Sequence, residues 1–347
     1  MEIKIGNKII GKNHRCFIIA EAGVNHNGDV LKAKNLIDIA KEAKVDAVKF
    51  QTWITEDLIT KSVDKAEYQK KNTVIQESQF EMIKKLELSF KEFRELKTYA
   101  DEREIIFLST PDEEKSVDFL EELEILAYKI GSGELTNIFI LKKIAEKGKP
   151  IILSTGMASL EEIQEAIDVI YKTGNKELIL LHCTSQYPTE YKDVNLRAML
   201  TLKEKFNTII GYSDHSIGTL VPQLAVSLGA KVIEKHFTYD INAIGPDHKC
   251  SLAPFELKKM VKKIRLVEQI LGNGKKEPTA EELKIKKLIR KTIVAKRDIP
   301  KGTKITKEML TVKRSNGALE PKEIKNIIGK TSLVDIEKDQ AFKLEYI

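Results

Sequence analysis

The sequence predicts a (β/α)₈ barrel of the TIM type followed by a small β-rich domain. Three observations predict this α/β fold. Eight short apolar runs recur within the first 272 residues, helical periodicity fills the stretches between them, and both patterns end after residue 272. The apolar fraction of 42% is enough for a normal core. Buried strands that alternate with amphipathic helices indicate a parallel sheet with helices outside.

The eight apolar runs are the predicted strands, and each ends in polar residues or glycine. They are continuously apolar, which is typical of parallel strands that are covered on both faces. Because eight strand–helix units fit into about 260 residues, a closed barrel is favoured over an open sheet. The runs are residues 17–23, 47–53, 105–110, 127–133, 151–156, 178–183, 209–215 and 232–238.

The stretches between the runs have the spacing of amphipathic helices, most clearly in residues 29–44, 159–174 and 255–272. Ser159 is predicted to cap the second of these helices and Gly174 to end it. The one long connection, residues 54–88, follows the second strand. It is predicted to be a loop with a short helix that covers the top of the barrel, and long connections of this kind are usually functional.

The chain changes character after the barrel, which is predicted to span residues 1–272. Residues 273–291 are predicted to be a linker and 292–347 a separate small domain. The region 273–347 holds 19 Lys and Arg against 11 Asp and Glu, whereas the region 1–272 holds 39 against 41. This charge difference indicates two parts with different roles. A domain of fewer than ~60 residues is marginal alone, so we expect it to depend on the barrel or on a partner chain.

Composition argues against several classes of protein. Cys16, Cys183 and Cys250 are widely spaced and form no CxxC pair, so neither a disulfide framework nor a zinc knuckle is predicted. Only eight of the 58 basic residues are Arg and the net charge is +6, which disfavours a nucleic-acid binder. There is no signal-like stretch at the N-terminus and no apolar run long enough for a membrane span. We therefore expect a soluble, cytoplasmic protein.

Polar side chains stand at the predicted ends of all eight strands. A barrel places its active site at the C-terminal ends of its strands, so we expect these side chains to share one face. They are Glu21, Lys49, Gln51, Ser109, Thr110, Lys129, Ser132, Glu134, Ser154, Thr155, His182, Ser213, Asp214, His215, Glu234, Lys235 and His236.

Two of these residues, His215 and His236, end the adjacent seventh and eighth strands. Neighbouring strands lie ~4.8 Å apart, so both imidazoles could bind one divalent cation. Two nitrogen ligands indicate an open site suited to Mn²⁺ or Zn²⁺ acting as a Lewis acid. Asp247 or His248 could add to the same site.

A second group combines Lys49 and Lys129 with the hydroxyls of Thr110, Ser132 and Ser154. Lys129 precedes a Gly-Ser-Gly segment, whose backbone N–H groups can approach an anion closely. Together these residues could bind a phosphate and a carboxylate on one small substrate. One of the lysines could instead be a Schiff-base nucleophile, as in class I aldolases, but the surrounding hydroxyls favour anion binding.

The motifs together resemble the sialic acid synthase family, whose relatives make neuraminate, legionaminate and pseudaminate. The resemblance covers nearly the whole chain, and residues 295–314 resemble the family's C-terminal antifreeze-like (SAF) domain. The barrel segments that carry it are IAEAGVNHNGD (19–29), VKFQT (48–52), YKIGSGELTN (128–137), ILSTGM (152–157), LLHCTSQYPT (180–189), GYSDHS (211–216), EKHFT (234–238) and GPDHKCSL (245–252).

The resemblance implies an enzyme that condenses phosphoenolpyruvate with N-acetylmannosamine and water, giving N-acetylneuraminate and phosphate by C–O cleavage. It implies catalytic roles for Glu134, Lys129 and Glu21, and a divalent metal on His215 and His236. That metal is Mn²⁺ by resemblance, with Mg²⁺ or Co²⁺ as alternatives. It also implies a homodimer in which Arg314 of the swapped C-terminal domain reaches the partner's site. The implied substrate-binding residues are Lys49, Gln51, Asn72, Thr110, Ser132, Ser154, Tyr187, Ser213, Asp247 and Arg314.

The sequence leaves the sugar open. Ser185 stands where the family often has Asn, and GPDHKCSL is closer to legionaminate-type members. The alternatives are a synthase that uses 2,4-diacetamido-2,4,6-trideoxymannose and one that uses a 6-phosphorylated sugar to make sialate 9-phosphate. Outside this class, the alternatives are a Schiff-base aldolase and a glycan- or ice-binding protein. The last would leave the polar strand ends unexplained.

Overall fold

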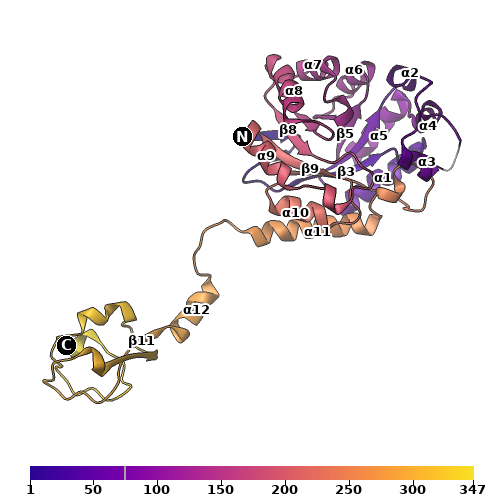
Figure 1. Cartoon of the computed structure of the whole chain (residues 1–347). Coiled ribbons are helices and arrows are strands. Elements are labelled where there is room, and N and C mark those ends of the chain that lie inside the picture. The colour runs from indigo at the N-terminus through magenta and orange to yellow at the C-terminus, as the bar shows by residue number, and fades with distance from the viewer. Residues whose placement is uncertain (74–75) are drawn as a thin grey trace. The chain divides into compact units, whose positions relative to one another are not determined.

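The computed structural model describes residues 1–73 and 76–347 and divides the chain into two compact units, Met1–Gly272 and Asn273–Ile347 (Figure 1). Each unit has its own apolar core. No helix in the described chain is both long and apolar enough to span a membrane.

Eight parallel strands form the barrel of the first unit, and each coincides closely with one of the predicted apolar runs. Around the sheet they follow the order β5-β4-β3-β10-β9-β8-β7-β6, and β5 lies against β6, so the ring is nearly closed. The predicted eight-stranded barrel is confirmed, although β5 extends one residue beyond its predicted run, to Pro111. The strands are β3 (Phe17–Gly23), β4 (Ala47–Thr52), β5 (Ile106–Pro111), β6 (Tyr128–Ile130), β7 (Ile151–Ser154), β8 (Leu178–His182), β9 (Ile209–Asp214) and β10 (Val232–His236).

Helices cover the outside of the barrel. The helix α8 (Leu160–Lys172) begins as predicted: the Ser159 hydroxyl accepts a hydrogen bond from the Glu162 N–H, and the Glu162 carboxylate accepts one from the Ser159 N–H. Such a capping box satisfies two N–H groups that the helix leaves unpaired. The other helices around the barrel are α1 (Val30–Ala43), α5 (Phe90–Glu102), α6 (Glu114–Glu122), α7 (Ile138–Glu146), α9 (Arg197–Phe206), α10 (Leu220–Ser227) and α11 (Pro254–Leu271).

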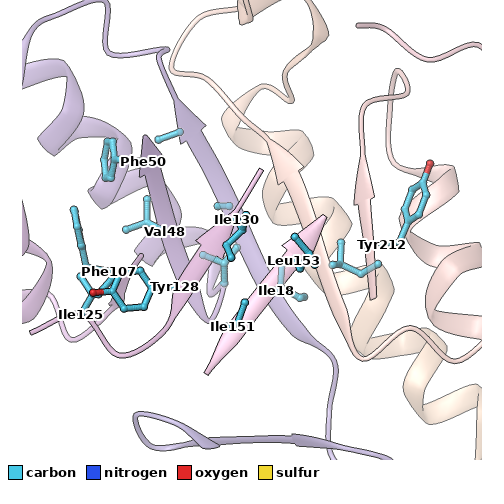
Figure 2. Close-up of a cluster of buried hydrophobic side chains, with 14 of the residues drawn as sticks. Ile18, Val48, Phe50, Phe107, Ile125, Tyr128, Ile130, Ile151, Leu153 and Tyr212 are labelled. Carbon is cyan, nitrogen blue, oxygen red and sulfur yellow. The ribbon is translucent and has the colours of Figure 1, made fainter. Parts of the chain in front are cut away.

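Strand residues that point outward form the larger core, between the sheet and the helices. Phe50 and Phe107 stack with their ring centroids 5.5 Å apart, and the Tyr128 hydroxyl donates to the Val117 carbonyl on α6. Figure 2 shows part of this cluster on its strands. Its labelled members are Ile18, Val48, Phe50, Phe107, Ile125, Tyr128, Ile130, Ile151, Leu153 and Tyr212.

Strand residues that point inward near the N-terminal ends form a second apolar core inside the barrel. An N-terminal hairpin that we did not predict closes this end. Its strands, β1 (Glu2–Ile5) and β2 (Lys8–Gly11), are antiparallel and bury Ile3, Ile5 and Ile10 against the inward residues. The interior is therefore apolar at one end, and polar groups inside the barrel are confined to the other end.

The long connection after β4 contains three helices rather than the one predicted: α2 (Thr55–Leu58), α3 (Glu67–Thr73) and α4 (Gln79–Leu86). Ser78 and Glu81 form a capping box at the start of α4, a signal that the sequence carried. Met82 and Leu86 of α4 pack on Val24 and Trp53 at the C-terminal ends of β3 and β4, so this connection covers the top of the barrel there, as predicted. Residues 74–75, within this connection, lie outside the described chain.

The second unit begins with α12 (Ala280–Ile289), which falls in the predicted linker, and continues with the antiparallel pair β11 (Lys291–Ala295) and β12 (Leu310–Arg314). Ile293, Ile299, Ile305 and Phe342 are among the residues of its core. Single 3₁₀ turns complete both units: η1 (Ser132–Glu134), η2 (Tyr191–Asp193), η3 (His248–Cys250), η4 (Lys307–Met309), η5 (Pro321–Asn326) and η6 (Leu344–Tyr346).

Candidate active site

Strand alternation divides the polar strand-end residues into an inward and an outward set, because successive side chains of a strand point to opposite faces. The inward residues lie two positions beyond the apolar inner layer: Glu21 follows Ile19, Lys49 follows Ala47 and Glu234 follows Val232. The expectation that all the strand-end side chains share one site is wrong for six of them: Glu134 lines no cavity, and five others point outward. The outward residues Ser109, Thr155, His182, Asp214 and Lys235 instead bond to neighbouring strands and loops.

The inward residues surround a cavity of about 290 Å³ at the C-terminal end of the barrel. We call it the polar cavity. It brings together most of the predicted site residues, although they come from seven strands and the loops that follow them. Its lining includes Glu21, Lys49, Gln51, Thr110, Lys129, Ser132, Ser154, Tyr187, Ser213, His215 and His236, together with Asp112, Met157, Cys183, Ser185 and Glu234.

Two lysines and two glutamates form a buried charge layer at the base of the polar cavity. The Lys49 ammonium lies 2.7 Å from Glu21 Oε2 and 3.7 Å from Glu234 Oε2, and it donates to Thr110 Oγ1 at 3.0 Å. The Lys129 ammonium lies 3.5 Å from Glu234 Oε1 and donates to Ser154 Oγ at 2.8 Å. The opposite charges balance, so the layer can stay buried without a ligand.

The two glutamates of this layer differ in pKa because Glu234 lies near both lysines, whereas Glu21 is paired with Lys49 alone. Burial raises the pKa of Glu21 to about 7, although Lys49 opposes the shift. The pKa of Glu234 is lowered to about 2, because Lys129 and Lys49 together outweigh its burial. Burial lowers the pKa of the Lys129 ammonium, an effect that Glu234 only partly offsets. Glu21 is thus the carboxyl of the layer that can exchange a proton near pH 7.

His215 and His236 face each other across the cavity, with ring centroids 5.7 Å apart. Burial lowers the pKa of both imidazoles below the ordinary histidine value, so both are neutral at pH 7. The His215 Nδ1–H donates to the Thr184 carbonyl at 2.7 Å, which leaves the lone pair of Nε2 available. His236 Nδ1 is buried without a hydrogen-bond partner.

These donors fit a divalent cation in an open site. No group of three or more His, Cys, Asp and Glu within residues 1–73 and 76–347 is arranged to hold a metal ion. The protein would therefore supply two nitrogen ligands, and water or substrate would supply the rest. The Asp247 carboxylate is 3.9 Å from His236 Nδ1 and adjoins this pair.

A second cavity of about 210 Å³ adjoins the polar cavity and shares Gln51, Asp112, Tyr187 and His236 with it. We call it the side cavity. The Tyr187 ring lines both cavities. It stacks on Tyr68 of α3, with ring centroids 5.3 Å apart, and lies tilted against the His215 ring, with centroids 4.1 Å apart. The rest of the side cavity has a largely apolar lining: Val24, Trp53, Leu58, Met82, Ile83 and Leu86, with Tyr68, Gln69, Pro246 and Asp247.

Three predicted site residues do not line either cavity. Asn72 donates to the Pro246 carbonyl at 2.7 Å and so ties α3 to the loop that follows β10. The Glu134 carboxylate accepts a hydrogen bond from Asn137, the N-cap of α7, at 2.6 Å. Arg314 ends β12 in the second unit and is exposed. Their roles stay predictions.

Two charged residues of the polar cavity, Glu234 and Asp112, are absent from the predicted site. Glu234 was noticed at a strand end but was given no role, although its position two residues before His236 places it on the inward face. Asp112 directly follows β5 and lines both cavities. Burial and the nearby Glu134 raise the pKa of Asp112 to about 7. The sequence does carry a signal for Asp112. Leu108, Thr110 and Asp112 are two residues apart, so all three are expected to point into the barrel.

The chain is similar to known proteins along its whole length. Residues 36–276 match the NeuB family and residues 290–345 match the SAF domain. The chain is 47% identical to N,N'-diacetyllegionaminic acid synthase of Legionella pneumophila, over 99% of this chain and 97% of that protein. It is 39% identical to human N-acetylneuraminate-9-phosphate synthase, over 97% and 94%.

Solved structures agree with the sequence relatives. The N-acetylneuraminic acid (sialic acid) synthetase of Leptospira borgpetersenii, solved in complex with citrate, superposes with a TM-score of 0.74. It is 40% identical, and the match covers 82% of this chain and 96% of that one. The family match, the relatives that are similar over the whole length and the barrel with polar side chains at its C-terminal face all agree. We conclude that the chain belongs to the NeuB family of sialic-acid-type synthases and carries a SAF domain at its C-terminus.

Proposed function

We propose that the chain condenses phosphoenolpyruvate with an open-chain N-acylated hexosamine to give a nine-carbon 2-keto acid and phosphate. The observation that carries this proposal is the pair of adjoining cavities, one lined by two buried ammonium groups and several hydroxyls, the other largely apolar. A small dianionic or trianionic substrate suits the first and a sugar with apolar substituents suits the second. The names of the relatives support a sugar acid as the product.

Phosphoenolpyruvate is assigned to the polar cavity. Lys49 and Lys129 provide two buried ammonium groups, and Ser132 and Ser154 provide hydroxyl groups. Ser213 lines the cavity beside them and donates its hydroxyl to Glu234 Oε1 at 2.9 Å. Ser132 Oγ accepts a hydrogen bond from the Gly156 N–H at 3.0 Å and lies 3.2 Å from Cys183 Sγ. Sulfur is a weak acceptor, so a bound anion would compete well for the Ser132 hydroxyl proton. Charge-assisted hydrogen bonds of this kind are roughly twice as strong as neutral ones. They would hold the phosphate and carboxylate in one orientation.

The sugar is assigned to the side cavity, and we propose 2,4-diacetamido-2,4,6-trideoxymannose. The methyl groups of its acetamides and its C6 methyl match the lining of Val24, Trp53, Leu58, Met82 and Leu86. The identities to relatives named diacetyllegionaminic acid synthase, 47% and 46%, support this sugar. N-Acetylmannosamine is the second candidate, favoured by the 40% identity to the sialic acid synthetase structure.

In the proposed reaction, C3 of phosphoenolpyruvate bonds to the aldehyde carbon and the aldehyde oxygen gains a proton. Water adds at C2 and loses one proton, which leaves a hydroxyl there. The C–O bond to phosphate then breaks as this hydroxyl becomes the C2 carbonyl, and its proton leaves with the phosphate. Glu21, with its pKa of about 7 inside the polar cavity, is placed to hold or release a proton. A divalent cation held by His215 and His236 would supply Lewis-acid polarisation of the aldehyde. The walls of the two adjoining cavities would hold the two substrates together.

A substrate panel tests the choice of sugar. We expect phosphate release from phosphoenolpyruvate with 2,4-diacetamido-2,4,6-trideoxymannose at a kcat/KM at least tenfold above that with N-acetylmannosamine or its 6-phosphate. One buried methyl group is worth ~1 kcal/mol or more, so two suffice for this preference. Equal or higher kcat/KM with N-acetylmannosamine would overturn the choice of sugar and leave the reaction class standing. Trapping of a lysine by borohydride would indicate the aldolase class instead.

Asp112 is expected to bind the sugar. Its carboxyl lines both cavities and makes no hydrogen bond or ion pair with any described residue. Because its pKa is about 7, it is largely protonated at pH 6 and ionised at pH 8, where it is the stronger acceptor. KM for the sugar should therefore fall as pH rises through about 7. Asp112→Asn should raise this KM about tenfold at pH 8 and abolish its pH dependence, with KM for phosphoenolpyruvate little changed.

The comparison across pH is the decisive measurement for Asp112, because the Asn variant keeps the shape of the side chain. An unchanged KM profile in the variant would show that another group, Glu21 being the nearest with a similar pKa, controls sugar binding.

We propose that the active site is shared between two chains, with Arg314 reaching the partner's barrel in a homodimer with swapped C-terminal domains. The net charge of +8 in residues 273–347 suits an anionic partner surface, and the barrel residues 1–272 carry a slight negative excess. Co-expression of Lys129→Ala with Arg314→Ala tests this. Mixed dimers would contain one intact site each, so about a quarter of wild-type activity should return. No recovery would mean that the second unit acts on its own barrel.

A further inference from the structure

A cavity of about 1040 Å³ lies at the opposite end of the barrel from the polar cavity. Phe17, the first residue of β3, and Asp46, just before β4, form part of its wall. The other walls are the β1–β2 hairpin, the C-terminal end of α1 and one face of α11. In Figure 1, α11 runs along the outside of the barrel beside α10, and it also packs against α1. We call this space the basic cavity.

Eight cationic side chains line the basic cavity and only two carboxylates, Glu42 and Asp46, do so. Asp46 is already bound, because it lies 3.0 Å from the Lys8 ammonium and 2.9 Å from the Arg265 guanidinium. The remaining six cations make no ion pair within the described residues, in contrast to many lysines elsewhere on the barrel. These six are Arg15, Lys44, Lys258, Lys259, Lys262 and Lys263.

This concentration of charge is local rather than a property of the whole unit. Residues 1–272 hold 39 Lys and Arg against 41 Asp and Glu, so the rest of the first unit is clearly acidic. Lys258 and Lys262, like Lys259 and Lys263, are four residues apart on α11, and like charges at this spacing destabilise a helix by a few tenths of a kcal/mol. A helix that only needed solubility would intersperse carboxylates, and a bound anion would relieve the repulsion.

The base of the cavity is rigid and partly apolar. Arg265 donates to the Cys16 carbonyl at 2.7 Å and to Asp46, while Glu268 accepts from the Cys16 N–H. These bonds lock α11 to the chain that enters β3. Ile9 and Leu266 line the cavity and remain 43% and 53% exposed. Exposed apolar side chains within a ring of cations suit a ligand that has both an apolar body and an anionic group.

We propose that the basic cavity binds a nucleoside phosphate, with the phosphates on the lysines of α11 and the base on Ile9 and Leu266. Inorganic phosphate would fill only a small part of the volume and would leave both apolar side chains uncovered. The Asn7 amide and the His14 ring, which also line the cavity, provide hydrogen-bonding groups for the edge of a base. The site is independent of the proposed reaction, because it lies at the N-terminal ends of the strands.

Calorimetric titration of the full chain with ADP, CDP and pyrophosphate tests this proposal. We expect micromolar binding of a nucleoside diphosphate that weakens as salt rises from about 50 to 300 mM. Lys258→Gln/Lys262→Gln should weaken it at least tenfold. The matched double variant Lys203→Gln/Lys205→Gln, on α9, removes the same charge outside the cavity and should change the affinity less than twofold. Leu266→Ser should weaken binding of the nucleotide but not of pyrophosphate.

Binding must also be separated from the polar cavity, which has its own cations. The titration is therefore repeated with phosphoenolpyruvate present at saturation, and the nucleotide affinity should not change. The proposal is overturned if neither nucleotide binds, if phosphoenolpyruvate displaces them, or if the α11 variant and its control behave alike. Pyrophosphate binding as tightly as ADP would overturn the assignment of the base to Ile9 and Leu266.

Discussion

Replacing Lys129 by Met is expected to reduce kcat/KM by about 10²–10³-fold while the protein stays folded. The Lys129 ammonium is buried, donates to Ser154 and is assigned to the phosphate or carboxylate of phosphoenolpyruvate. Truncating one partner of a buried charge pair costs ~2–5 kcal/mol, and each ~1.4 kcal/mol is a factor of ten. The loss should appear mainly with phosphoenolpyruvate as the varied substrate.

The fold should tolerate this change because the charge layer can rebalance. Without the Lys129 ammonium, the Glu234 carboxylate still has an ion pair with Lys49 at 3.7 Å and accepts a hydrogen bond from the Ser213 hydroxyl at 2.9 Å. Glu21 already has a pKa of about 7, and losing a nearby positive charge raises that pKa further. Glu21 then takes up a proton at neutral pH, so that no carboxylate is left without a partner.

Lys235→Met is the matched control, since Lys235 is an equally buried lysine on the outward face of β10. Its ammonium lies 2.6 Å from Asp214, and both side chains are fully buried. Removing it leaves a buried carboxylate uncompensated, which costs ~3–5 kcal/mol of folding free energy. Urea unfolding should show this loss for Lys235→Met but not for Lys129→Met. A Lys129 variant that unfolds as readily, or that retains full activity, would contradict the division into inward and outward sets.

Removing divalent metal is expected to reduce turnover to below ~1% of its starting value, and Mn²⁺ should restore it better than Ca²⁺. The reason is the pair of neutral imidazoles of His215 and His236, whose ring centroids lie 5.7 Å apart. Imidazole nitrogens suit a borderline cation, whereas Ca²⁺ prefers oxygen ligands. His236→Ala should abolish both activity and Mn²⁺ binding measured by electron paramagnetic resonance.

His182→Gln provides the control for metal binding. This histidine ends β8 but points outward, where its Nε2 bonds the Val194 carbonyl. The variant should bind Mn²⁺ as the wild type does. Full activity after exhaustive treatment with EDTA would exclude a metal role, and Mn²⁺ binding that survives His236→Ala would place the ion elsewhere.

Much of the barrel could be predicted from the sequence because each strand is a continuous apolar run that ends in polar residues. The same pattern located most of the polar cavity, since Lys49, Lys129 and His215 all follow such runs. The pattern alone could not show that Lys129 points into the cavity and Lys235 points away from it. Both are lysines near a strand end, and only the inward or outward register distinguishes a site residue from a structural ion pair.

The parts that were missed depend on long-range contacts. Residues 2–11 carry a hairpin signal that was overlooked, because Gly6-Asn7 is a two-residue turn between two short runs rich in isoleucine. That this hairpin closes the barrel, however, is recognised only from its burial against the inner layer. Asp112 follows a proline at the end of a strand and resembles an ordinary turn residue. The basic cavity is formed by α1, α11 and the hairpin, which are far apart in the chain.

The pairing of β3 with β10 has a consequence for synthesis of the chain on the ribosome. Phe17 aligns with Val232, so the first barrel strand lacks one neighbour until the last has been made. Such non-local contacts slow folding and leave strand edges exposed meanwhile. The apolar inner layer, which reaches from Ile3 to Val232, likewise cannot close earlier. A nascent chain that stalls before residue 232 is therefore a target for chaperones or proteolysis, whereas one that has passed Gly272 holds every strand of the barrel.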